Sequence, residues 1–323
     1  MTDALDVFVG TDRSQLLAVA VLEYSIRRHT RETVRVFPLI DLDLPEPKDL
    51  RHGSRTNFSF ARFAIPALKG YRGKGLYLDA DMLVFRDIAA LWRLPFDGAT
   101  ILIQGELSPQ IMKSNKIGAP TTRKKQCSVM MIDCAAAKWH APTIIEGLDG
   151  QYTYDQLMSE MCILREEQVG YTLPFEWNSL EYYDENTCLI HYTDMHTQPW
   201  VSTENGNGYL WLAEVRRMLN EGVLTWTALQ TEIDLGYFRP SLIDELNDPG
   251  ALEGWSEERA QQLAAIDAHA GFVKHAEVYA RKKARAAAVK AYEAQLALRK
   301  PQPAAGPGEP AVATERHAQL MPA

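Results

Sequence analysis

The stretch Tyr77-Leu78-Asp79-Ala80-Asp81-Met82-Leu83-Val84 places two acidic residues inside an otherwise apolar run. The apolar residues on both sides are typical of a strand, and successive side chains of a strand alternate between its two faces. The side chains of acids at positions i and i+2 can therefore point toward the same position at the end of the strand. Burying an unpaired carboxylate costs on the order of several kcal/mol, so we expect a cation beside Asp79 and Asp81.

A divalent metal ion is one cation that fits, since carboxylate oxygens favour Mg²⁺ and Mn²⁺ over softer metals. The alternatives are a structural ion pair with Arg62 or Lys74, and an acid pair on a solvated loop. Phosphatases of the haloacid dehalogenase type also carry an Asp-x-Asp tripeptide after a strand. They carry it on the first strand, however, and here two predicted strands precede the motif.

The residues before and after this motif alternate between strand and helix patterns. A strand over 6–9, a helix over 16–29 and a strand over 34–40 come first, an order typical of a parallel α/β sheet. A helix is also expected over 56–68, bent or restarted at Pro66. Further strands are predicted over 75–85, 101–104, 128–133 and 190–193.

The character of the sequence changes after about residue 240. Residues 257–300 are rich in Ala, Glu, Lys and Arg and show no strand pattern, which predicts helices. Residues 301–323 are rich in Pro, Ala and Gly, which predicts disorder. We therefore expect an α/β domain over 1–240 that carries the chemistry, a helical C-terminal extension over 241–300 and a disordered tail.

Composition narrows the class of protein. The formal net charge of −8 argues against a general nucleic-acid-binding protein. The four cysteines show no Cys-x-x-Cys spacing, so neither a zinc cluster nor a disulfide framework is indicated. No apolar run approaches the roughly 18 residues of a membrane-spanning helix. The acidic N-terminus does not read as a signal peptide, so a cytoplasmic enzyme is expected.

A second group of polar residues follows the last predicted strand, in His191-Tyr192-Thr193-Asp194-Met195-His196-Thr197-Gln198-Pro199-Trp200. A histidine at a strand end can supply a nitrogen ligand to the cation expected at Asp79 and Asp81. The alternative is that His191 is a hydrogen-bonded core residue, because it follows the apolar pair Leu189-Ile190.

Six short motifs lie in a fixed order between residues 5 and 200. They are Phe8–Asp12, Ala61–Phe63 before Ile65-Pro66, Leu76–Val84, Asp155-Gln156, Leu173-Pro174 with Trp177-Asn178, and Ile190–Tyr192 with Gln198–Trp200. In these motifs and their order the chain resembles glycosyltransferase family 8. The resemblance implies a GT-A fold, a Rossmann-like mixed sheet flanked by helices, for a nucleotide-sugar transferase domain over 1–240. It also implies retaining transfer of a hexose from UDP-galactose or UDP-glucose, with Mn²⁺ or Mg²⁺, to a carbohydrate or glycolipid acceptor.

The resemblance also assigns a metal and donor site. Asp79 and Asp81 match the family's metal-binding pair, with Ala80 between them in the same cofactor-binding segment. His191 matches the third protein ligand of the metal. Arg62 matches an arginine that helps to hold the donor, and its alternative role is a structural ion pair.

Four further positions gain a role from the resemblance. Thr11 and Asp12 fall where the family contacts the uracil of the donor, although Asp12 is also placed to cap the following helix. Asp155 and Gln156 match catalytic residues near the donor sugar and the acceptor, with Gln156 the candidate to stabilise an oxocarbenium ion. The alternative for this pair is the outer face of a helix.

Two of the motifs depart from the family pattern. Gln198 stands where the family has a lysine on the diphosphate, Asp194 replaces a glycine, and the segment around Ser128 is altered. Candidates for a compensating group are His196, Lys124 and Lys125. The departures keep a second hypothesis open, a catalytically inactive protein of the same fold that binds nucleotide or sugar.

The segment 279–300 carries seven Lys and Arg residues against the single acid Glu293. A basic helix with Val289, Tyr292 and Leu296 on one face predicts weak contact with an anionic membrane surface, at the inner face of a membrane. The alternative is an Ala-rich, solvated helix that packs on the domain or on another subunit.

Overall fold

The computed structural model describes residues 4–56, 58–105 and 125–299. The strands are β1 (Leu5–Gly10), β2 (Val34–Leu39), β3 (Lys74–Asp79), β4 (Met82–Val84), β5 (Ile101–Gln104), β6 (Gln126–Asp133), β7 (Val169–Leu173), β8 (Ser179–Leu180) and β9 (Leu189–His191). The helices are α1 (Leu16–His29), α2 (Ile65–Leu68), α3 (Ala89–Trp92), α5 (Cys134–Ala137), α6 (Ala141–Glu146), α7 (Tyr154–Glu160), α8 (Gly208–Asn220), α9 (Trp226–Asp234), α10 (Leu242–Asn247), α11 (Glu257–His269) and α12 (Ala276–Arg299).

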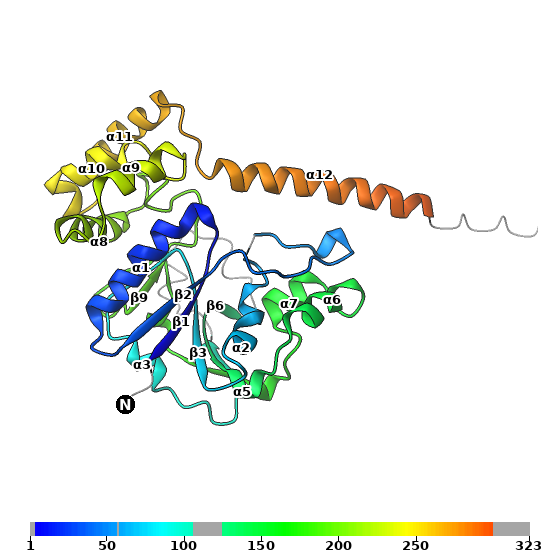
Figure 1. Cartoon of the computed structure of the whole chain (residues 1–323). Coiled ribbons are helices and arrows are strands. Elements are labelled where there is room, and N and C mark those ends of the chain that lie inside the picture. Colours follow the sequence, from blue (N-terminus) through cyan, green and yellow to red (C-terminus); the bar gives the residue numbers. More distant parts are fainter. Residues whose placement is uncertain (1–3, 57, 106–124, 300–323) are drawn as a thin grey trace, which may run out of the picture.

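Within this described part, six strands form the main sheet in the order β2-β1-β3-β6-β5-β7. β1 pairs in parallel with β2 and β3, whereas β6 runs antiparallel to β3 and β5, so the sheet is mixed. Helices pack on both faces, and α8–α11 form a group beyond one end of the sheet (Figure 1). The predicted α/β class, a mixed sheet flanked by helices with a helical C-terminal extension, is confirmed.

The central strands are apolar on both faces because helices cover both. Val7 and Val9 of β1 pack in the core that α1 covers, whereas Phe8 packs in the opposite core, which also contains Phe63. Leu78 and Tyr77 of β3 divide between the two cores in the same way. This explains why these strands read as continuous hydrophobic runs in the sequence.

The predicted strand over 75–85 is two strands in two sheets. β3 ends at Asp79, the chain turns at Ala80-Asp81, and β4 joins a smaller sheet of order β4-β9-β8 within the described residues. In this second sheet Met82 and Leu180 both pair with His191. The turn that carries the acids therefore lies where the two sheets meet.

The predicted helix over 56–68 is only partly present. The chain forms a 3-10 turn, η3 (Ala61–Ala64), and then the single α-helical turn α2. Pro66 lies in the first turn of α2, where its missing N–H costs nothing, and it cannot continue a helix from the preceding residues. Strands β7 and β8 were not predicted from the sequence.

The C-terminal helices share a core with the α/β part. Trp200, Trp211 and Phe238 pack together with ring centroids 5.6–6.3 Å apart. Leu17 and Val21 of α1 belong to the same buried cluster. Helices already dominate from α8 onward, before residue 240, and the predicted boundaries of the parts stay predictions.

The basic helix α12 turns its weakly apolar face toward the protein. Val289, Tyr292 and Leu296 are half-buried and share a helical face with Arg285, which donates to the carbonyl of Arg51. Membrane contact through 279–300 stays a prediction. Among the described helices, none is both long and apolar enough to cross a membrane. The tail 301–323, predicted to be disordered, lies outside the described residues.

A buried acid anchors the first strand of the sheet. Asp6 of β1 is 1% exposed, receives two hydrogen bonds from Arg35 at 2.6 and 2.9 Å, and also contacts Lys69. Burial raises the pKa of Asp6, but the hydrogen bonds from Arg35 and Lys69 outweigh burial and hold the pKa below its ordinary value.

We predict that Asp6→Asn lowers the free energy of unfolding by about 3 kcal/mol at pH 7, because Arg35 and Lys69 lose their buried partner. A lowered native pKa stabilises the fold above the unfolded pKa of about 4, and this contribution is lost on further acidification. The deficit of the variant should therefore shrink as the pH falls below about 4. Urea unfolding of both proteins, at pH 7 and at a pH below about 4, measures the difference in the free energy of unfolding. Equal stability of the two proteins at pH 7 would contradict the prediction.

Candidate metal and donor site

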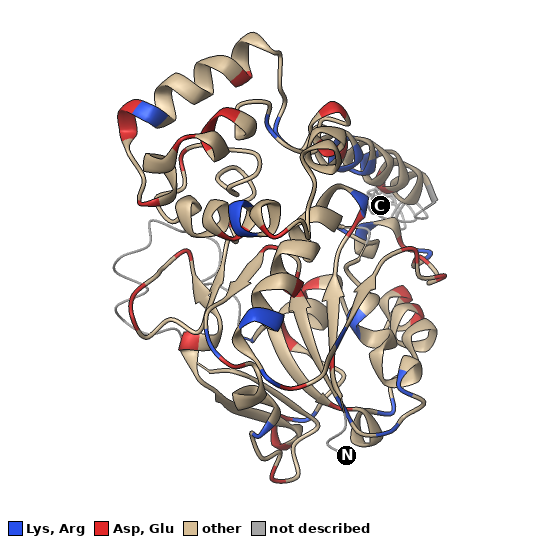
Figure 2. Cartoon of the chain, turned by 60° about the vertical axis from the view of Figure 1, so that its left-hand side comes forward, with Lys and Arg blue, Asp and Glu red and all other residues tan. Residues whose placement is uncertain are grey.

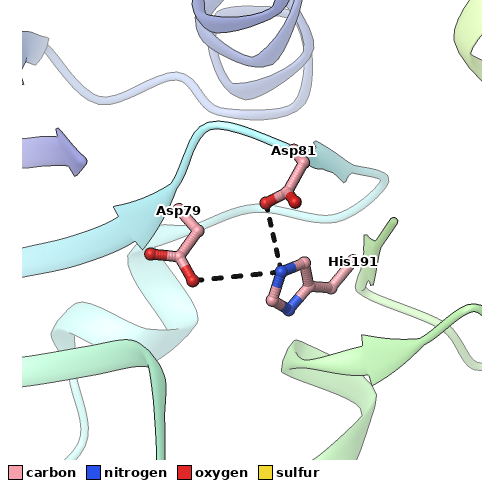
Figure 3. A group of neighbouring side chains, drawn as sticks. All are labelled: Asp79, Asp81 and His191. Atoms are coloured by element: carbon pink, nitrogen blue, oxygen red, sulfur yellow. Dashed lines mark ion pairs between the residues drawn. The ribbon is translucent and has the colours of Figure 1, made fainter. Parts of the chain in front are cut away.

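Three potential metal ligands meet where β3 ends. Asp79 ends β3, Asp81 lies in the turn to β4, and His191 ends β9. His191 Nε2 lies 3.1 Å from Asp81 Oδ1 and 3.9 Å from Asp79 Oδ2. One ligand atom from each side chain lies within 4.8 Å of the others, and the three side chains point toward one another (Figure 3). The structure therefore brings together the three residues expected to share one cation.

The His191 ring is held by a buried network on its other side. His191 Nδ1 lies 3.1 Å from Asn178 Oδ1, and Asn178 is fully buried. Asn178 Nδ2 donates to Gln104 Oε1 at 2.8 Å and to Ser128 Oγ at 3.2 Å, and its carbonyl oxygen faces the imidazole. His191 Nδ1 then carries the proton, and Nε2 keeps its lone pair for the space between the carboxylates.

Asp79 is held by a tyrosine and an arginine. Tyr77 Oη donates to Asp79 Oδ1 at 2.6 Å, and burial raises the pKa of Tyr77 so that it keeps its proton. Arg62 donates to Tyr77 Oη at 3.1 Å and to the Cys127 carbonyl at 2.7 Å, and lies 3.7 Å from Asp79. The ion pair with Arg62 considered from the sequence is thus present, whereas Lys74 contacts the Trp92 carbonyl instead.

Gln198, at the position where the resemblance expects a lysine, contacts Asp81 directly. Its Nε2 donates to Asp81 Oδ2 at 2.8 Å and to the Tyr192 carbonyl at 3.2 Å. The other candidates for a compensating charge are engaged elsewhere: Lys125 pairs with Glu166, and His196 stacks on Tyr279. Lys124 lies outside the described residues. Gln198 therefore orients the Asp81 carboxylate and, being neutral, supplies no positive charge to it.

The electrostatics of His191 follow from these contacts. Burial lowers the pKa of His191, but the carboxylates of Asp81 and Asp79 outweigh burial, so that its pKa lies above the ordinary value. A positive charge between the two carboxylates is therefore favoured. A divalent cation satisfies the same need and leaves the imidazole neutral as a ligand.

Asp12 and Thr11 lie beside this site because β1 and β3 are neighbours. Gly10, the last residue of β1, pairs with Asp79 in the sheet, and Thr11 and Asp12 follow it. Asp12 caps the 3-10 turn η1 (Arg13–Gln15), as the alternative interpretation expects, by accepting from Ser14 N at 3.0 Å. Its second carboxylate oxygen accepts from Arg281 of α12 at 3.1 Å.

Ala80 is 2% exposed and packs in the core, so its contribution to the site is the backbone turn between the two acids. Asp155 and Gln156 lie on the first turn of α7, are exposed, and are held there by other contacts. Asp155 pairs with Arg55 at 2.8 Å, and Gln156 forms a capping box with Thr153. The structure does not bring this pair into contact with the metal ligands, and its catalytic role stays a prediction.

Glu181 is a further acidic residue near the site, and the sequence analysis did not identify it. It directly follows β8, adopts a left-handed backbone with φ 54°, and has its pKa raised by burial. Its oxygens accept from Asp194 N and Asn205 Nδ2, both at 2.9 Å. Glu181 thus fixes the loop after β9, and no local sequence pattern marks this role.

Residues 47–141, which include Asp79 and Asp81, match the sequence profile described as Glycosyl transferase family 8. This match supports a glycosyltransferase that is similar to family 8 over these residues. The transferase is also 29% identical over 237 residues to Protein CDI of Arabidopsis thaliana, over 67% of the transferase and 87% of that protein. Its mixed sheet flanked by helices agrees with the fold that the resemblance implied.

Several solved glycosyltransferase structures are similar to the transferase at low sequence identity. The bifunctional glycosyltransferase WbbM is 14% identical with a TM-score of 0.49, over 67% of the transferase and 50% of WbbM. GlyE of Streptococcus pneumoniae is 17% identical with a TM-score of 0.46, over 73% of the transferase and 65% of GlyE. The galactosyltransferase LgtC is 16% identical with a TM-score of 0.42, over 61% and 89% of the two chains. The transferase thus spans half the length of WbbM.

We predict that Asn178→Ala weakens Mn²⁺ binding about tenfold, because His191 loses the acceptor that orients its ring. Ser128→Ala is the matched control: it removes a neighbour of Asn178 but leaves the contact between Asn178 and His191. Calorimetric titration with Mn²⁺ measures the affinity, and the melting temperature monitors folding. If a folded Asn178→Ala variant binds Mn²⁺ like the wild type, Asn178 does not position the ligand.

Proposed function

We propose that the transferase is a metal-dependent, retaining hexosyltransferase. It moves a hexose from a nucleotide sugar, UDP-galactose or UDP-glucose, to a carbohydrate or glycolipid acceptor. The observation that carries the proposal is the meeting of Asp79, Asp81 and His191 at the carboxyl end of β3. The loop after β1, with Thr11 and Asp12, adjoins it, and ligands of open α/β sheets bind at this edge.

The chemistry of these side chains fits Mn²⁺ or Mg²⁺. Two carboxylates and one imidazole are hard or intermediate ligands, and the imidazole favours Mn²⁺ of the two ions. Two buried polar atoms of neighbouring residues, Gln198 Oε1 and Gln104 Nε2, have no hydrogen-bond partner among the described residues, as expected of a site that a ligand completes. When bound, the ion supplies charge neutralisation for a diphosphate leaving group.

The residues of the chain hold this arrangement rigid. Tyr77 and Gln198 each fix one oxygen of a metal-binding carboxylate, which leaves the other oxygen for the ion. Glu181 accepts hydrogen bonds with both of its oxygens and so holds the loop after β9. The sequence offers no obvious carboxylate nucleophile, as is usual in the family that the chain resembles. Retention then proceeds by displacement on the same face of the sugar, through an oxocarbenium-like state, with Asp155 and Gln156 predicted near the sugar.

We predict that Asp79→Asn and Asp81→Asn each reduce Mn²⁺-dependent release of UDP from its sugar by at least about a hundredfold, because each removes a charge that holds the ion. The assay supplies UDP-galactose and UDP-glucose in turn. Asp234→Asn, the same substitution at an exposed position of α9, is the matched control and should be fully active.

His191→Ala should weaken Mn²⁺ binding in a variant that still folds, as a cooperative thermal transition shows. Metal-dependent turnover that survives in either aspartate variant would show that these carboxylates do not hold the ion. Unchanged Mn²⁺ affinity in His191→Ala would show that this histidine is a core residue only.

The second candidate is a protein of the same fold that binds nucleotide or sugar without turnover. Gln198 favours it, because this neutral, fully buried side chain contacts Asp81 at the position of the family's lysine. The two candidates differ in one measurement. Saturable binding of a UDP-sugar with Mn²⁺, without release of UDP in the presence or absence of acceptor sugars, would select the second.

A further inference from the structure

The segment that leads into α12 is attached to the loop after β9. Lys274 Nζ donates to the His196 carbonyl at 2.9 Å and to Ser202 Oγ at 2.8 Å. The ring of Tyr279, in the first turn of α12, stacks on the His196 ring with centroids 5.6 Å apart. The start of this helix is therefore fixed to the loop that also carries Gln198.

The same helix is attached to the loop after β1 and to the turn at 50–53. Arg281 Nη2 lies 3.1 Å from Asp12 Oδ2, and Asp12 is buried. Arg285 Nη2 donates to the carbonyls of Arg51 and Gly53 at 3.1 and 3.2 Å. α12 therefore crosses the sheet edge at which the donor site lies. Its Lys and Arg residues are visible in Figure 2 on the helix that ends beside the C label.

His275, one residue before α12, is a buried polar residue in this segment. It adopts a left-handed backbone with φ 49°, is 7% exposed, and its Nε2 has no hydrogen-bond partner among the described residues. Burial lowers the pKa of His275, and the Asp12 and Asp81 carboxylates both act against that lowering. His275 therefore places a buried polar group with an unpartnered Nε2 at the start of α12.

A small pocket separates α12 from the loops that follow β1 and β2. It is lined by Thr11, Asp12, Arg13, Ser14, Ile40, Asp41, Glu277 and Arg281. Of its two cations, Arg13 is bound through both Nη atoms to Glu232 outside the pocket, at 2.8 Å each. The partner of Arg281, in contrast, is the pocket residue Asp12. Arg281 is also 43% exposed, so it has room to reorient.

Binding of an anionic nucleotide sugar at this site requires a further positive charge. One divalent ion and Arg62, which lies 3.7 Å from Asp79, balance the carboxylates of Asp12, Asp79 and Asp81. The phosphates of a nucleotide sugar therefore add negative charge that these groups do not neutralise. Arg62 already donates to Tyr77 and to the Cys127 carbonyl. A guanidinium at the pocket wall is suited to phosphate, which it can bind through two parallel hydrogen bonds.

We propose that α12 forms one wall of the nucleotide-sugar site and that Arg281 is a donor-binding residue. Without donor, its guanidinium pairs with Asp12. The diphosphate of an arriving donor takes over the guanidinium and frees Asp12 Oδ2 to accept hydrogen bonds from the nucleoside. The inference rests on the proposed function and adds a role for the C-terminal extension in donor recognition.

The test compares Arg281→Gln and Arg281→Lys with Lys290→Gln, which removes the same charge from an exposed position further along α12. Calorimetry measures binding of UDP, GDP and ADP in the presence of Mn²⁺, and of the nucleoside that corresponds to the tightest diphosphate. Binding of Mn²⁺ alone and the melting temperature show that each variant is folded with an intact metal site.

Arg281→Gln should weaken the tightest diphosphate about tenfold, the effect of one charge-assisted hydrogen bond. It should not weaken nucleoside binding, because Asp12 Oδ2 is already free in this variant. Arg281→Lys should recover part of the loss, and Lys290→Gln should match the wild type. The inference is overturned if Arg281→Gln binds the diphosphate as tightly as the wild type does, or more tightly. It is also overturned if the variant loses affinity equally for the diphosphate and for the nucleoside. Wild-type protein that binds no diphosphate with Mn²⁺ overturns the proposed function, and this inference with it.

Discussion

Two carboxylates held at the end of a buried strand must be neutralised, and the rest of the structure is arranged around that need. Asp79 and Asp81 cannot move into solvent, because Tyr77 and Gln198 each fix one of their oxygens. His191 reaches them only because β9 pairs with β4 in a sheet separate from the main one. The site therefore depends on the junction of two sheets, and a shift of either register would separate its ligands.

The helical C-terminal part holds the loop after β9, next to the junction of the two sheets. Arg239, which is buried, donates from its backbone N–H to the Trp200 carbonyl at 2.8 Å and from Nε to the Pro199 carbonyl at 3.1 Å. These carbonyls directly follow Gln198, and Trp200 also packs on Trp211 of α8. The helices thus hold the loop that positions Asp81, while α12 reaches across the other side of the site.

Sequence patterns predicted the features that depend on local physics. The order of strands and helices followed from apolar periodicity, and Asp79 and Asp81 were identified because acids interrupt an apolar strand. His191 was placed beside them by its position at a strand end and by the family resemblance. The short strands β7 and β8 were missed. The roles of Asn178 and Arg281 were missed as well, because each depends on a tertiary contact that leaves no periodic signal.

The central claim is that Asp79, Asp81 and His191 hold one divalent ion, and crystals grown with Mn²⁺ and UDP test it most directly. Anomalous diffraction near the manganese absorption edge locates the ion independently of any assumption about ligands. The account predicts a single strong peak within about 2.3 Å of an oxygen of each aspartate and of His191 Nε2. A peak bound elsewhere, or one from which the imidazole of His191 is absent, would contradict it.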